Sequence, residues 1–84
     1  MPKKKTIQGQ ETLIGIVTPV QWNEFDQVTA VALSATDDEE YRIENGEEFI
    51  DLIQKVIEAS GEVRRDPKAT RTITIKHFNV IENF

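Results

Sequence analysis

Apolar residues recur at helical spacing in the segment that follows Asn45. Phe49, Leu52 and Val56 fall on one side of a helical wheel, whereas acidic and polar residues gather on the other. Asn45 is a favoured N-cap residue, and Glu48 three positions later completes the pattern of a capping box. The pattern therefore predicts an α-helix that begins at Asn45.

The end of this helix is ambiguous, because residues 57–64 also alternate between small or apolar and polar, which is the period of a strand with one buried face. Residues 71–81 are rich in Thr, Ile, Val and Phe and predict a strand that needs a partner of similar length. We therefore expect the helix to end near Gln54 or Lys55 and a strand to run from Val56 to Arg65.

Gly61 lies in the middle of this expected strand. A glycine there is typical of a β-bulge or of a close backbone approach. If the helix ran on instead, Gly61 would be its C-cap, and this alternative stays open.

Three further strands are predicted before the helix, at residues 11–20, 28–35 and 40–44. Tyr41 and Ile43 face inward in the third. In the strand at 71–81 the alternation slips, so a bulge is expected near Lys76 and His77. The order of elements predicts a mainly β fold, a five-stranded barrel with one α-helix between strands three and four.

The chain of 84 residues has the length of one domain. Residues 1–10 carry Lys3, Lys4 and Lys5 without apolar periodicity, which predicts a disordered basic arm before a single domain at 11–84. No run reaches the roughly eighteen apolar residues of a membrane helix, and the first ten residues lack the apolar core of a secretion signal. We expect a monomeric cytoplasmic protein that does not bind membranes.

Charge is distributed unevenly along the chain. The net charge of −5 argues against tight, sequence-independent capture of nucleic acid. Residues 37–58 hold nine acidic side chains against two basic ones, whereas residues 62–76 hold five basic against two acidic. A basic region could therefore meet an anionic ligand, although the same pattern is also that of a solvated surface.

Several of these features together resemble a known fold family. Gly15 lies in the first strand, the capped helix lies between strands three and four, and the segment Ala59-Ser60-Gly61-Glu62-Val63 leads into Thr72-Ile73-Thr74-Ile75 and Phe78-Asn79-Val80-Ile81. Residues 11–82 thereby resemble a small stand-alone bacterial OB-fold domain. The resemblance implies ligand binding across strands two and three and the loops that join strands one to two and four to five.

Carried onto this chain, the resemblance implies a set of candidate ligand-binding residues: Trp22, Phe25, Tyr41, Arg64, Arg65, Lys68 and Arg71. Aromatic rings can stack on bases and arginines can contact phosphates, so single-stranded nucleic acid is the first expected partner. A protein partner docked on the acidic side of the helix or on a strand edge is the alternative. Tyr41 also alternates as a core residue, and Trp22 could fold back as a lid on the barrel.

The sequence indicates no catalytic chemistry. The chain has no cysteine and a single histidine, His77, which is expected to be structural or exposed. The acidic run 37–40 lacks the alternating spacing and the glycine of a calcium-binding loop. We therefore expect a non-catalytic binding module with no cofactor and no metal.

Overall fold

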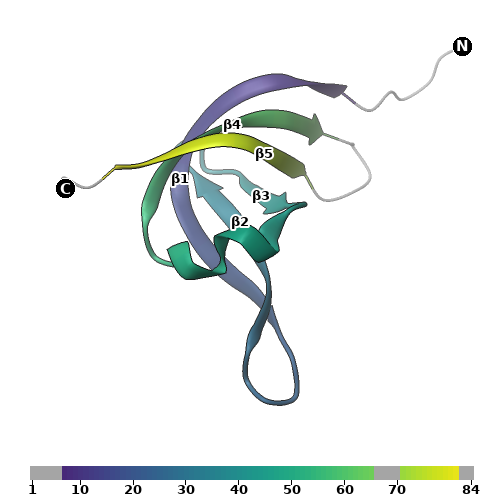
Figure 1. The fold of residues 1–84 in the computed structure, drawn as a ribbon. Helices are drawn as coiled ribbons and strands as arrows, with labels where there is room; N and C mark the ends of the chain where they lie inside the picture. The colour runs from purple at the N-terminus through teal and green to yellow at the C-terminus, as the bar shows by residue number, and fades with distance from the viewer. Residues whose placement is uncertain (1–6, 66–70, 82–84) are drawn as a thin grey trace, which may run out of the picture.

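The computed structural model describes residues 7–65 and 71–81. Its elements are β1 (Ile7–Trp22), β2 (Val28–Ala35), β3 (Glu40–Ile43), the short helix η1 (Gly46–Leu52), β4 (Val56–Arg65) and β5 (Thr72–Ile81) (Figure 1). Strand β1 begins at Ile7, inside the segment for which a disordered arm was predicted. The three lysines of that arm, and the candidate ligand residue Lys68, lie outside the described residues.

The five strands form one sheet that closes into a ring in the order β1-β2-β3-β5-β4. Neighbouring strands are antiparallel, except β3 and β5, which are parallel and pair at only two positions. Strand β1 pairs with β4 along its first part and with β2 along its last part, so it belongs to both sides of the ring. The mainly β prediction, with one helix between the third and fourth strands, is confirmed at this level.

The bounds of β4 confirm the prediction that the helix ends before Val56. It pairs with β1 and β5 along its length, from Val56 opposite Ile16 and Ile81 to Arg64 opposite Thr72. The register with β5 shifts between Ser60 and Gly61, where Lys76 is the extra residue on β5. This confirms the bulge expected near Lys76 and His77.

Two glycines allow neighbouring strands to approach closely. A Cβ atom on Gly61 would lie 1.9 Å from the carbonyl oxygen of Thr74, and one on Gly15 would lie 2.3 Å from that of Ser34. Both distances are far below van der Waals contact, so the ring accepts no side chain at either position. Gly61 is therefore a close-approach residue beside a bulge and not a helix C-cap.

The predicted α-helix is wrong in type and in its cap. Residues Gly46–Leu52 form a 3-10 helix, and the Asn45 side chain makes no cap hydrogen bond. The Asn45 amide instead bonds to the backbone of Ile75 on β5: its Nδ2 donates to the carbonyl oxygen at 2.8 Å, and its Oδ1 accepts from the N–H at 3.0 Å. The Asn45 side-chain amide thus continues the pairing with β5 beyond Ile43, the last residue of β3.

Tertiary pairing also explains why η1 stays short. The chain must be extended again at Val56, and Gln54 already donates its backbone N–H to the carbonyl oxygen of Val17 at 2.8 Å. Gln54 takes a positive φ of 75° to make this turn. Phe49 points into the ring and is buried, so η1 acts as a plug at one end of the core.

The core is built from residues that alternate inward on all five strands and from Phe49. Tyr41 and Ile43 are both buried, as the alternation of β3 predicted. The residue between these two, Arg42, points outward to the surface of β3.

A candidate ligand-binding hollow and an aromatic hairpin

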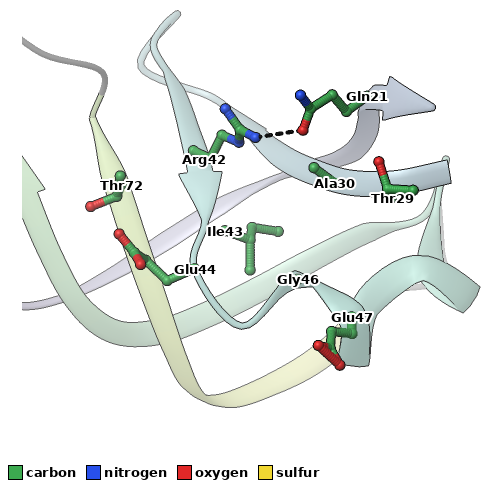
Figure 2. Close-up of a pocket in the computed structure, with 9 residues that line it drawn as sticks. All are labelled: Gln21, Thr29, Ala30, Arg42, Ile43, Glu44, Gly46, Glu47 and Thr72. Carbon is green, nitrogen blue, oxygen red and sulfur yellow. Dashed lines mark hydrogen bonds between the residues drawn. The ribbon is translucent and has the colours of Figure 1, made fainter. Parts of the chain in front are cut away.

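A surface hollow of about 470 Å³ lies over β2 and β3. Side chains from β1, β2, β3, the β3–η1 connection, η1 and β5 surround it (Figure 2). The lining residues are Gln21, Thr29, Ala30, Arg42, Ile43, Glu44, Gly46, Glu47 and Thr72. We refer to this set as the hollow.

Strand alternation aims the central cation of the hollow outward. Arg42 lies between the buried residues Tyr41 and Ile43, so its side chain must leave the opposite face of β3. Its guanidinium donates from Nη2 to Oε1 of Gln21 at 3.0 Å, a contact drawn in Figure 2. The carboxylates of Glu44 and Glu47 also line the hollow, so its ionised side chains carry one positive and two negative charges.

The β1–β2 hairpin extends beyond the ring next to the hollow (Figure 1). Its loop is organised by Asn23, whose Oδ1 accepts from the backbone N–H of Phe25 at 2.8 Å and of Gln27 at 3.0 Å. Asp26 takes a positive φ of 62° within the turn. The loop is therefore ordered by its own hydrogen bonds and does not fold back on the core.

This hairpin presents two aromatic side chains to solvent. Trp22 is 54% exposed and Phe25 is 73% exposed, so Trp22 is not a lid on the barrel. Glu24 and Asp26 flank Phe25 and are exposed as well. We call residues 22–27 the aromatic hairpin; they contain two acidic side chains and no basic one.

Tyr41, a candidate for base stacking, is fully buried. Its hydroxyl donates to Oδ2 of Asp37 at 2.8 Å and accepts from Nη2 of Arg65 at 2.9 Å. Burial, reinforced by the hydrogen bond to Asp37, raises the pKa of Tyr41 above its usual value. The Tyr41 ring belongs to the core and offers no exposed face for base stacking in this structure, so its predicted contact with a ligand has no support here.

Arg65 is likewise occupied within the protein. Its two terminal nitrogens contact both carboxylate oxygens of Glu11, with 2.9 Å between Nη2 and Oε1, and its guanidinium carbon lies 5.4 Å from the centre of the Tyr41 ring. The hydrogen bond from Arg65 lowers the pKa of Glu11. We call Glu11, Asp37, Tyr41 and Arg65 the polar lock, since they join β1, β3, β4 and the β2–β3 turn.

The remaining basic candidates are separated from the aromatic ones. Arg71 pairs with Glu39, with 3.2 Å between Nη1 and Oε1. Arg64 is exposed on β4 and lines a smaller hollow of about 150 Å³ together with Thr72 and two glutamates. Neither lines the hollow beside the aromatic hairpin. The two hollows share Glu44 and Thr72, so Arg64 lies near the hollow without lining it, and the predicted cluster of aromatic and basic residues does not line one common cavity.

Arg42 is the cation that the sequence analysis missed. The alternation of β3, with Tyr41 and Ile43 inward, already places Arg42 on the outer side. The OB-fold resemblance also implies ligand binding across this strand. Gln21, Glu44 and Glu47 gave no local signal, because only the closing of the ring brings the ends of β1, β3 and η1 together.

Comparison of the chain with protein-family models, with curated proteins and with solved structures gave no match. In the part of the chain that the structure describes, no helix has the length and apolar character that a membrane crossing requires. Within residues 7–65 and 71–81 no three histidine or carboxylate side chains gather as metal ligands.

Proposed function

We propose that this chain is a non-catalytic binding module of the OB-fold type that docks an extended protein segment carrying basic and apolar side chains. The closed five-stranded ring, the helix between β3 and β4, and the hollow over β2 and β3 support the OB-fold assignment. The docking surface consists of the aromatic hairpin and the adjoining hollow.

One observation favours a basic protein segment over nucleic acid as the partner. The two exposed aromatic rings of the aromatic hairpin have acidic neighbours, Glu24 and Asp26, and the loop itself holds no basic residue. Exposed aromatic side chains are typical anchors of protein interfaces, because burying them releases much apolar surface from water. Acidic neighbours favour lysine and arginine on the partner and repel a phosphate backbone.

The hollow extends the same charge preference. Arg42 is held by Gln21, and the carboxylates of Glu44 and Glu47 give the hollow a negative balance. An extended segment that packs an apolar side chain against Phe25 can place a neighbouring basic side chain near these carboxylates. Arg42 would then bind a carbonyl or carboxylate and fix the direction of the segment.

Single-stranded nucleic acid is the second candidate. Trp22 and Phe25 are accessible for stacking, and Arg42 lies on the face where the OB-fold resemblance places the ligand. It ranks below the protein partner because Arg65 and Arg71 are already paired with carboxylates.

Fluorescence of Trp22, the only tryptophan, gives a direct test. The protein is titrated with a short alternating Lys/Leu peptide, with a matched Glu/Leu peptide and with oligothymidylate. The proposal expects the Lys/Leu peptide alone to change the emission, and expects Phe25→Ala to abolish the change while Ser34→Ala, on the outer side of β2, leaves it intact. Quenching by oligothymidylate that weakens with salt would replace the proposal by the nucleic-acid function, and silence towards all three probes would reject both.

A further inference from the structure

The two halves of β5 differ in their neighbours. Residues 72–75 have β4 on one side and β3 or the Asn45 amide on the other. Beyond Lys76, strand β5 still pairs with β4 as far as Ile81, but β3 has ended. Among the described residues, the backbone of 76–81 makes hydrogen bonds with β4 alone. We call this segment the β5 free edge.

Such an edge offers unpaired N–H and C=O groups to another strand, because alternate residues of a strand point these groups away from each neighbour. Proteins usually block exposed edges with proline, charges or a covering loop. The β5 free edge has no proline, and after Lys76 at the bulge it has no Asp, Glu, Lys or Arg side chain. Phe78 is 43% exposed.

The orientation of the Phe78 ring is fixed by a contact within the protein. Its ring packs edge-on against Phe49 of η1, with 5.0 Å between centroids and 71° between planes. Because the buried Phe49 fixes one side of the ring, little side-chain entropy is lost when the other side is covered.

The charge of the chain indicates which strand could pair with the β5 free edge. The net charge of −5 makes most surfaces of two copies repel each other, whereas the β5 free edge contains no acidic residue. Antiparallel pairing of this edge with itself, centred on Asn79, sets Phe78 opposite Val80 of the second copy, and the same pair occurs twice by symmetry. Aromatic and β-branched residues opposite each other form favourable cross-strand pairs.

We propose that two copies of this chain associate through their β5 free edges as an antiparallel, two-fold dimer that joins the two sheets. The contact is short, so the dimer is weak and its population depends on protein concentration. The aromatic hairpins lie outside the contact, so each copy keeps its own proposed docking surface.

Sedimentation equilibrium tests the dimer, comparing the wild type with Asn79→Lys. The wild type is expected to rise from a monomer mass of 9.6 kDa towards twice that value as concentration increases. Asn79→Lys places two like charges face to face at the two-fold axis and is expected to raise the dissociation constant about tenfold or more. Asn79→Glu is expected to act in the same way, since the sign of the charge is irrelevant at a symmetric contact.

Ser34→Lys is the matched control. Ser34 is an exposed outward residue of β2 that is paired on both sides, with Ile16 and with Glu40, so the same charge is added away from the free edge. This variant is expected to dimerise as the wild type does, with circular dichroism confirming that each variant is folded. A wild type that stays monomeric up to about 1 mM, or a dimer that Asn79→Lys leaves unchanged, would overturn the proposal.

Discussion

The polar lock and the aromatic hairpin both combine aromatic rings with charged side chains, but they serve opposite purposes. In the polar lock, Tyr41 is fully buried and its hydroxyl is bonded to Asp37 and Arg65. In the aromatic hairpin, Phe25 is 73% exposed, and its ring is the part of the molecule for which we propose a partner contact. Residue type alone does not distinguish a structural group from a binding group; the hydrogen bonds and the exposure do.

The difference follows from the cost of burying polar atoms. A buried tyrosine hydroxyl must find partners within the protein, since an unsatisfied one costs about 1–3 kcal/mol. The polar lock supplies these partners and thereby ties three strands and a turn together. The aromatic hairpin needs no such network, because water satisfies its polar groups and Asn23 shapes its loop.

The largest expected effect comes from removing the ring at the centre of the polar lock. Tyr41→Ala leaves a cavity in the core and removes a partner from both Asp37 and Arg65, so we expect a loss of about 3–5 kcal/mol in the free energy of unfolding. Phe25→Ala, in the aromatic hairpin, is expected to change it by no more than about 0.5 kcal/mol. Urea unfolding followed by circular dichroism measures both, and similar losses in the two variants would remove the distinction between the regions.

Replacing Arg65 or Arg42 with methionine is expected to give an intermediate difference in the free energy of unfolding. Arg65→Met leaves the Glu11 carboxylate and the Tyr41 hydroxyl without a donor, and we expect it to cost about 1–3 kcal/mol. Arg42→Met removes an exposed contact with Gln21 and is expected to cost about 0.5 kcal/mol or less. The melting temperatures of the two variants test the order, and equal melting temperatures would show that the polar lock contributes no more than a surface hydrogen bond.

The polar lock should also respond to acid. The hydrogen bond from Arg65 lowers the pKa of Glu11 below its usual value of 4.5, and although burial acts to raise the pKa of Asp37, hydrogen bonds from Tyr41 and from the Glu39 backbone bring it below 3.8. A lowered folded-state pKa contributes stability that is present above the unfolded value and is lost as the pH falls through the folded value.

We therefore expect the urea midpoint of the wild type to fall as the pH drops below about 4.5. Arg65→Met should lose less over the same interval, because Glu11 no longer has a partner that prefers its charged form. Urea titrations from neutral pH to about pH 3 decide this, and parallel curves for the two proteins would show that Glu11 and Arg65 are not coupled.

Much of the strand structure follows from the alternation of apolar and polar residues in the sequence. The bounds of β2 and β4, the inward position of Tyr41 and the bulge on β5 were all predicted from periodicity. Arg65 has the same parity as the buried Val63, so the pattern itself placed it on the inner side of β4. The resemblance implied a ligand contact for Arg65, whereas the structure shows its guanidinium bonded to Glu11 and Tyr41.

The predictions that were wrong depended on contacts distant in sequence. The apparent capping box at Asn45 is a local pattern, but the amide bonds to Ile75, thirty residues away. Similarly, the hollow gathers residues from β1, β2, β3, η1 and β5, and no local window of sequence contains them together. The ring closure that unites them is a property of the whole chain.

Asn23→Ala is expected to change stability less than either polar-lock variant, and it is the variant most informative about binding. Asn23 is exposed, so its loss should lower the free energy of unfolding by only about 0.5–1 kcal/mol, but it frees the backbone N–H groups of Phe25 and Gln27. We expect these two amides to exchange hydrogen faster, and we expect binding of the Lys/Leu peptide to weaken, because an unfixed Phe25 must lose more conformational freedom on binding. Glu24→Ala, at a neighbouring position of the loop, is the control for exchange. If Asn23→Ala speeds hydrogen exchange without weakening the binding of the Lys/Leu peptide, the order of the hairpin has no part in recognition. Phe25 would then act as a flexible anchor.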